Sequence, residues 1–577
     1  MRVLRRCVGT AAVLTLILNA NSVARLYQHG FSSEHAWSYG FRGASENVDA
    51  ARRMTVRACA AGGAVAYCPP YDGWLTPVDR SRILAMSWET APLPVTYGRA
   101  SEFRGCDYVV SSAHGVEDEM RNGLGDQYHI VDTDGGLNLW SRAKKDYLPR
   151  MGEMLTHTFG GIVATAVLAA FVGLLFCVGR AEGVVFGVGL STVLTFVQAI
   201  CLQSIDPVWH ALVLASSFAV VWILRRIGIL RGAASVSTLR GNGQRERAVC
   251  VCLGVALLCA YGVLTLTHTF VAPNGLGTVG GKARLMLLAR GFPPGFFVDP
   301  TFMLYQPAYP PGGALFLLGG YMITGICDEW MIQLLNCLLM SMLAFLLFSR
   351  VRNWALRLLV LAFFLSPLAV RLATLLYPEV WVGLCVIAGW VRIRRNSLDW
   401  AGWFAIGLSG WFKNEGIVYL CVLACASLIF SRRNERLPIL PRVCCAIMLP
   451  LSWHIGCRTC GASLDGYSSI FAASPLKGWL GLLKLVSYSF LQSWRYAFVF
   501  PMSAICFVWG SFRPRAFKIA WTGTLLAFCA FSVIYAMSSA CDFSWHLESA
   551  ERVLWVPALL LLYEILEFIR EPHLARL

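Results

Sequence analysis

Long apolar runs recur along the chain, and they constrain its fold more than any other feature of the sequence. Runs such as 158–178, 208–224 and 249–271 each hold about enough residues to cross the hydrocarbon core of a bilayer as a helix. Hydrophobic residues make up 57% of the chain and charged residues 14%, whereas a soluble globular protein carries roughly 25% charged residues. The sequence therefore excludes an ordinary soluble enzyme and predicts an all-α polytopic membrane protein.

The N-terminal part departs from this pattern. Residues 1–22 combine three Arg with a short apolar run and predict a signal anchor. A cleaved signal peptide is the alternative, although the residues after the run make a poor cleavage site. Residues 23–156 form the one long polar stretch, and we predict that they fold outside the cytoplasm as a small α/β module. The expected elements are a strand from Cys106, a helix over Val116–Gly123, and two strands joined by a turn at Asp134-Gly135-Gly136.

The distribution of charge fixes a predicted topology. Residues 23–156 hold 14 Lys and Arg against 16 Asp and Glu, so the chain's net charge of +16 comes from the short loops between apolar runs. Basic loops of membrane proteins stay in the cytoplasm, which explains this excess without a nucleic-acid partner. Successive loops of a multi-pass protein lie on alternate sides of the membrane. If the basic loop near 225–247 is cytoplasmic, the chain has about 14 spans, with the signal anchor included. This assignment of sides holds only if residues 312–324 do not cross the membrane, so we predict that they form a juxtamembrane or re-entrant helix.

We expect a multi-pass protein of the plasma (inner) membrane with the lipid bilayer as its surroundings. The predicted spans after the module are 158–178, 183–203, 208–224, 249–271, 331–348, 356–374, 377–391, 400–412, 416–431, 443–457, 496–511, 519–538 and 553–569. Residues 157–248 would hold accessory helices and the basic cytoplasmic loop, and 249–570 the main transmembrane core. Outside the cytoplasm would lie 272–311, the turns at Tyr377 and Lys413–Gly416, 458–494 and 539–552. The polar residues that could take part in binding or catalysis all fall on this one face.

Three stretches of this face together resemble the GT-C class of bacterial membrane glycosyltransferases. The first contains Lys282-Ala283, Phe297-Val298-Asp299-Pro300 and Tyr309-Pro310-Pro311, similar to that class's first external loop. The second, Lys413-Asn414-Glu415-Gly416, is similar to a turn between two helices of bacterial members. The third, His546 to Arg552, resembles the segment that opens the last helix. The resemblance covers about residues 249–570 and implies transfer of a sugar from a polyprenyl-phosphate donor to a glycan, lipid or protein acceptor.

The resemblance implies roles for particular residues. Asp299 and Glu379 are the candidate catalytic carboxylates, because an acceptor hydroxyl must lose its proton as the bond forms. The candidates for binding donor phosphate or substrate are Lys282, Lys413, Glu415, Arg552, His546 and Tyr309. No cofactor is implied, and a role for a divalent metal stays open. Cys457 and Cys460 have zinc-like spacing, but no second pair follows, so we predict no metal ligand set here.

One departure keeps other functions open. Many relatives carry an Asp just after the first core helix, whereas this chain reads Ala272-Pro273-Asn274 there and its next acid is Asp299. Asp299 and Tyr309-Pro310-Pro311 can also be read as a structural turn, Glu379 as a residue that stabilises a helix N-terminus, and Lys413 and Glu415 as a simple ion pair. The alternatives to an enzyme are a transporter or flippase of lipid-linked glycans and a catalytically silent relative that binds a partner. The clustering of charge at the outer surface favours the enzyme.

Overall fold

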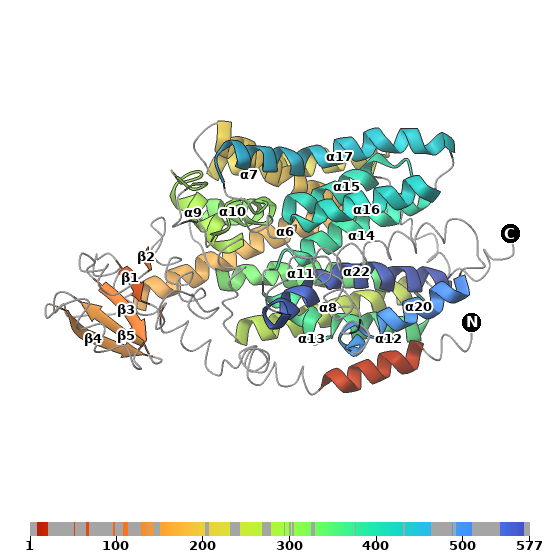
Figure 1. Ribbon diagram of the computed structural model, residues 1–577, viewed down its shortest axis with the longest axis horizontal. Helices are drawn as coiled ribbons and strands as arrows, with labels where there is room; N and C mark the ends of the chain where they lie inside the picture. The colour runs from red at the N-terminus through yellow and green to blue at the C-terminus, as the bar shows by residue number, and fades with distance from the viewer. Residues whose placement is uncertain are drawn as a thin grey trace.

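The computed structural model describes part of the chain, and the strands and helices lie in separate regions of it (Figure 1). The described residues are 8–20, 51, 65–68, 96–97, 108–112, 128–134, 137–141, 151–201, 207–230, 243–267, 279–293, 295–298, 302, 305–324, 329–375, 377–430, 433–462, 487, 492–510 and 543–570. The strands form a sheet beyond one end of a helical bundle, beside the start of α6 (Met151–Cys201).

The sheet has five strands in the order β2-β1-β3-β5-β4. They are β1 (Val65–Cys68), β2 (Thr96–Tyr97), β3 (Tyr108–Ser112), β4 (His129–Asp134) and β5 (Leu137–Ser141). The sequence predicts the last three: β4 and β5 pair as an antiparallel hairpin around the expected turn, and β5 pairs with β3. The parallel strands β1 and β2 were not predicted. The expected helix over Val116–Gly123 lies outside the described residues.

The rest of the described chain is helical. The helices after α6 are α7 (Pro207–Arg226), α8 (Gly243–Thr267), α9 (Lys282–Leu288), α10 (Gly312–Thr324), α11 (Glu329–Phe348), α12 (Trp354–Phe364), α13 (Pro367–Thr374), α14 (Glu379–Arg395), α15 (Trp400–Phe412), α16 (Glu415–Phe430), α17 (Arg433–Thr459), the short 3₁₀ helix η6 (Ser493–Tyr496), α20 (Val499–Gly510) and α22 (Phe543–Arg570). Most of these helices coincide with predicted apolar spans to within a few residues, whereas α8, α17 and α22 begin six to ten residues earlier than predicted. Two other predicted spans differ in shape. The predicted span 519–538 lies outside the described residues.

The first exception concerns α6, which is continuous where two spans were predicted. A Cβ atom added to Gly183 would lie 2.4 Å from the carbonyl oxygen of Leu175. Eight residues of a straight helix extend about 12 Å, so the chain must reverse between Val178 and Ala181. Gly187 also abuts the Leu175 side chain. The two halves of α6 therefore pack as a hairpin, which agrees with two separate apolar segments.

The second exception is the predicted span 356–374, which is bent rather than straight. It consists of α12 and α13, whose axes differ by 60°. Ser366 caps α13 by accepting a hydrogen bond from the backbone N–H of Ala369, and Pro367 follows at the first helical position. Ser-Pro is a helix-start signal, since proline has no N–H to continue the preceding helix. The sequence therefore contained the evidence for this bend.

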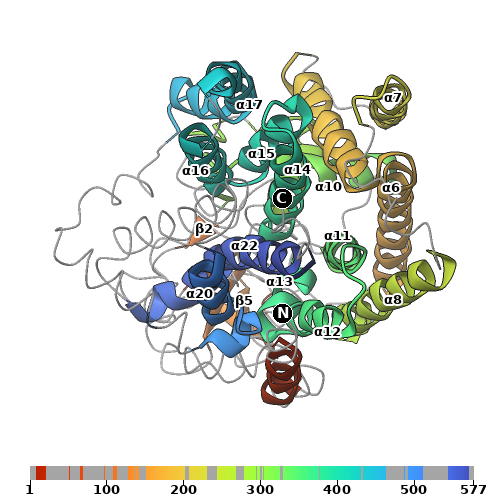
Figure 2. The same cartoon turned by 90° about the vertical axis from the view of Figure 1, so that its right-hand side faces the viewer.

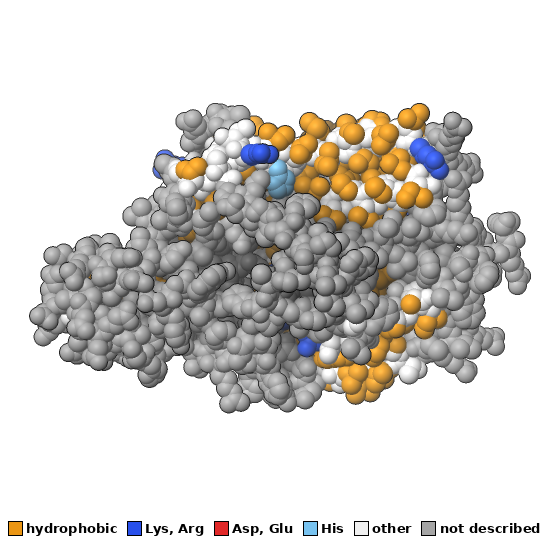
Figure 3. Space-filling model, in the orientation of Figure 1, with side chains coloured by type: hydrophobic (Ala, Val, Ile, Leu, Met, Phe, Trp, Pro, Cys, Tyr) orange, Lys and Arg blue, Asp and Glu red, His pale blue; other side chains and the backbone are white. Residues whose placement is uncertain are grey.

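The outer surface of the bundle is apolar where it is described. Within the described residues, four helical segments are long and apolar enough to cross a membrane, namely Ala181–Ala199, Pro207–Arg226, Ala248–Thr265 and Glu435–Thr459, and α12 with α13 counts as a fifth if the bent pair is one span. Hydrophobic side chains cover the face that carries α17 (Figure 3), where Leu437 is 76% and Met448 61% exposed. α7 and α17 both lie at the periphery (Figure 2). Such exposure suits a lipid environment and would be unfavourable in water.

At the centre, α14 is surrounded by other helices. It packs as a hairpin against α15, where Gly389 and Gly402 let the two backbones approach closely. On another side it contacts α22, and Gly383 of α14 leaves space for Trp555 and Leu559 of α22. α14 and α22 run in the same direction, because the first parts of both helices meet and the last parts of both helices meet. This pair positions the candidate site.

Candidate functional site

The candidate site lies where two turns of the chain and the first half of α22 meet. Glu379 begins α14, directly after the Tyr377-Pro378 turn. Lys413 and Asn414 form the turn between α15 and α16, and Glu415 begins α16. Arg552 comes from α22. Segments that are far apart in the sequence therefore deliver charged side chains to one end of the bundle.

Glu379 and Lys413 are at the centre of this site. The Lys413 Nζ atom lies 3.0 Å from Glu379 Oε1 and 2.8 Å from Glu415 Oε1. An Arg552 Nη1 atom lies 3.7 Å from the same Glu379 oxygen. The Glu379 side chain is only 2% exposed, and those of Lys413 and Arg552 are 10% and 14% exposed. Charges so far from water are stable only when paired, so each member depends on the others.

The local sequence explains the tight turn that presents Lys413. The backbone of Lys413 is extended and ends α15, and the Gly416 N–H donates to the Lys413 carbonyl at 2.8 Å. A Cβ atom at position 416 would lie 2.1 Å from the Ser409 carbonyl carbon. Only glycine fits there, because the obstacle is backbone and cannot rotate away. Ser409 also donates through its hydroxyl to the Gly416 carbonyl.

Aromatic rings border the charged groups. The Arg552 guanidinium carbon lies 4.4 Å from the centroid of the Tyr377 ring, a cation–π contact. Trp381, one half-turn below Glu379, stacks on Phe412 with ring centroids 5.1 Å apart and planes 7° apart. Phe316 of α10 contacts Trp381 edge-on. The charged groups thus have an apolar lower boundary, which strengthens their interactions by keeping water away.

Lys282 and Tyr309 form a separate contact in the segment before α10. The fully buried Lys282 ammonium donates to the carbonyls of Gln306 at 3.1 Å and Tyr309 at 2.9 Å. Burial lowers the pKa of Lys282 to about 7, while the nearby Cys457 opposes this shift. Its described contacts hold the Tyr309-Pro310-Pro311 element in place. Whether Lys282 also meets a donor phosphate stays a prediction.

The segment before α10 and the charged cluster are neighbours. Gly312, the first residue of α10, lies against Trp411 and Phe412 at the end of α15. The indole N–H of Trp453 on α17 donates to the Ala308 carbonyl at 3.1 Å. The segment before α10 therefore packs on the end of α15 that precedes Lys413, and on α17.

The structure brings together four of the predicted site residues: Glu379, Lys413, Glu415 and Arg552. It brings Lys282 and Tyr309 to each other. Asp299 lies outside the described residues, and so does the side chain of His546, although α22 includes this residue. Tyr377 was predicted only as part of a turn. An aromatic residue before proline at the start of a predicted span was the available signal for its contact with Arg552.

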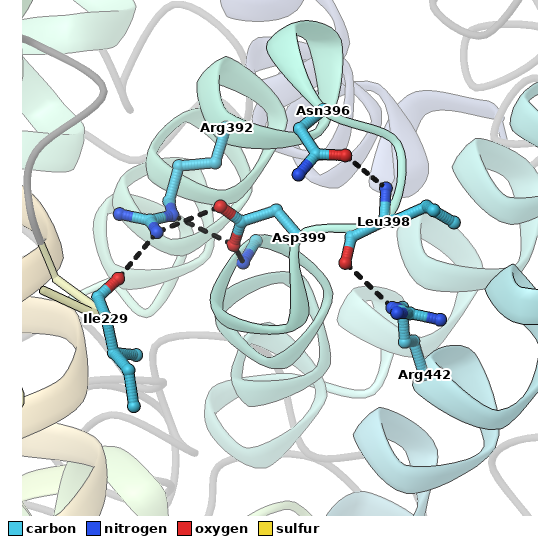
Figure 4. A network of polar contacts seen from close by, with 7 residues as sticks. Ile229, Arg392, Asn396, Leu398, Asp399 and Arg442 are labelled. Atoms are coloured by element: carbon cyan, nitrogen blue, oxygen red, sulfur yellow. Dashed lines mark hydrogen bonds and ion pairs between the residues drawn. The ribbon is translucent and has the colours of Figure 1, made fainter.

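The opposite end of α14 carries two further polar networks. In the first, Arg392 donates to both carboxylate oxygens of Asp399 at 3.0 and 2.9 Å, and to the Ile229 carbonyl (Figure 4). In the second, the indole N–H of Trp390 donates to Glu564 Oε1 at 2.9 Å, and Arg394 lies 3.6 Å from both Glu564 and Glu567. These networks join α14 to α15 and to α22 at the end remote from the candidate site.

The described residues include no group of three or more His, Cys, Asp or Glu side chains that could hold a metal ion. Cys457 and Cys460 are both free cysteines. Comparison of the chain with protein-family models, curated proteins and solved structures found no match. The case for a function therefore rests on the sequence and on this geometry.

Proposed function

We propose that this protein is a membrane glycosyltransferase that moves a sugar from a polyprenyl-phosphate donor to a glycan, lipid or protein acceptor. The observation that carries the proposal is the convergence of Glu379, Lys413, Glu415 and Arg552 at one end of an apolar bundle. Such a site offers charged groups at the membrane edge and an apolar surface beside them for a lipid tail.

The proposal includes the finer topology. We place this end of the bundle at the extracytoplasmic face of the plasma membrane, with residues 23–156 on the same side and about 14 spans in total. In support, α9 of the external loop lies toward the end of the bundle that carries the sheet (Figure 1). The basic loop 231–247 is then cytoplasmic.

The reaction needs a base, positive charge beside the leaving phosphate, and an acceptor bound in a fixed position. The acceptor oxygen attacks the anomeric carbon, the bond from that carbon to the phosphate oxygen breaks, and the acceptor proton passes to a carboxylate. The polyprenyl phosphate leaves as an anion, so no acid is needed to protonate it. Cations near the leaving oxygens would stabilise their growing charge.

We assign the base role to Asp299 and a positioning role to Glu379. Protonation of Glu379 would remove the negative charge that Lys413 and Arg552 share, although Lys413 keeps its contact with Glu415, and this loss is costly at a site so poorly exposed to water. Glu379 is therefore a poor proton acceptor. Asp299 is the other candidate catalytic carboxylate, and it is the one acidic residue in the sequence between residues 272 and 311.

The test is transfer by the purified protein in liposomes, with a panel of polyprenyl-phosphate hexoses and pentoses and a soluble acceptor analogue. We expect Asp299→Asn to lower turnover by about 10²-fold or more without loss of donor binding. The matched control is Glu564→Gln, which alters a buried carboxylate at the remote end of the bundle. If Asp299→Asn keeps the parent rate and Glu379→Gln does not, Glu379 is the base. Absence of transfer from every donor in the panel would contradict the function.

A further inference from the structure

The carboxylates of the candidate site have unused hydrogen-bonding capacity. Glu379 and Glu415 each direct one oxygen to Lys413, at 3.0 and 2.8 Å. The second oxygen of each, Oε2, is shielded from solvent and has no hydrogen-bond partner in the described part of the chain. A buried carboxylate oxygen without a partner costs about 1–3 kcal/mol or more, so a ligand that donates a hydrogen bond to it is stabilised there. A ligand of these two oxygens must therefore be a hydrogen-bond donor.

The charges of the cluster restrict what that partner can be. Two carboxylates, Glu379 and Glu415, face two cations, Lys413 and Arg552, so their formal charges cancel. An added phosphate has only acceptor oxygens to offer and would meet the two unpartnered carboxylate oxygens with like charge. A metal ion or an ammonium group would lie close to the Lys413 ammonium, which is within 3.0 Å of both carboxylates. A neutral donor of hydrogen bonds fits both restrictions.

We propose that Glu379 and Glu415 bind hydroxyl groups of a sugar, with Lys413 holding the two carboxylates in register. This inference rests on the proposed function, because that function makes a sugar the neutral donor present at the site. Each free Oε2 atom accepts one hydroxyl, so two hydroxyls of the same ring are recognised together. The cluster then selects the sugar, whereas the polyprenyl phosphate is bound elsewhere in the site.

Binding of free sugars tests the inference separately from transfer. The protein is purified in a zwitterionic detergent without a sugar headgroup and titrated with a panel of methyl pyranosides and methyl furanosides. Calorimetry provides the affinity. We expect at least one glycoside to bind. Inorganic phosphate should not displace it at any concentration at which the protein stays soluble.

Substitutions identify the groups that recognise the sugar. Hydrogen bonds to charged acceptors contribute about 1.5–3 kcal/mol, so Glu379→Gln and Glu415→Gln should each weaken binding of that glycoside about tenfold or more. Glu415 has a 29% exposed side chain, so its variant is the one whose folding is least at risk. Glu564→Gln is the control and should bind the glycoside with the parent affinity. Binding of undecaprenyl phosphate should be nearly unchanged in Glu415→Gln.

Three results would overturn the inference. One is that no glycoside of the panel binds, and another is that Glu415→Gln binds glycosides as the parent does. The third is that Glu415→Gln loses undecaprenyl phosphate but keeps glycosides, which would make the cluster a phosphate site. If the parent transfers sugar and Glu415→Gln binds glycosides as the parent does, the proposed function stands and only the assignment of Glu415 to sugar binding is refuted. Glycoside binding through Glu415 without transfer from any donor refutes the function alone.

Discussion

At the scale of single residues, Gly416 shows how a turn is set by the space around one position. A methyl group there would collide with the backbone of Ser409 and Gly410, so Gly416→Ala must displace the Lys413 turn. We expect a loss of about 1–3 kcal/mol in stability, from overpacking, together with loss of transfer. Thermal unfolding of the purified protein measures this. Gly456→Ala is the matched control, since a Cβ atom there meets nothing within 4 Å. An equal effect of both variants would contradict the steric argument.

Lys282 makes a prediction about pH. Its pKa of about 7 in the folded protein lies below the ordinary value of 10.5. Between these two values the unfolded chain binds more protons than the folded one, so Lys282 makes stability rise with pH above about 7, by at most about 1.4 kcal/mol per pH unit. Unfolding curves from pH 6 to 9 should show this rise in the parent and a flatter profile in Lys282→Met. Identical slopes would mean that the lysine remains charged.

At the scale of elements, the turn between α14 and α15 depends on Asp399. This carboxylate accepts from the Gly402 N–H at 2.8 Å as the N-cap of α15 and pairs with the buried Arg392. Asp399→Ala removes both interactions and leaves Arg392 without its counter-charge, so we expect a loss of about 3–5 kcal/mol. Asp399→Asn keeps the cap and should lose less. Comparing the unfolding temperatures of the two variants separates the cap from the ion pair, and equal losses would show that the cap contributes little.

The elements also show how far sequence alone could go. Helix α15 coincides with the predicted 400–412, because apolar composition and flanking charges define a span without any knowledge of its neighbours. The bend at Ser366 was missed although its cap signal was present. Strands β1 and β2 were missed because short parallel strands depend on partners far away in the sequence. Within the site, the predicted topology put Glu379, Lys413 and Arg552 on one face of the membrane, but it did not predict their direct contacts. It could not predict that Lys282 is buried by its own loop, since that depends on packing.

At the scale of the whole molecule, the proposed orientation can be tested directly. An epitope tag inserted after Ser237 should be reached by antibody only in permeabilised cells, because the surrounding Arg-rich loop is predicted to stay in the cytoplasm. A tag inserted after Asn274, in the predicted external loop, should be reached in intact cells. If the tag after Ser237 is reached in intact cells, the topology is inverted and the candidate site faces the cytoplasm.

The parallel pair of α14 and α22 has a mechanical consequence. Charged contacts join the two helices at Glu379 and Arg552, and again at Arg394 and Glu564, about 22 Å further along α14 and about 18 Å further along α22. With two such contacts along their shared length, α14 and α22 can neither slide nor rotate against each other without breaking buried ion pairs. Under the proposed function, we therefore expect the movement that admits a substrate in the segment before α10 and not in this helix pair.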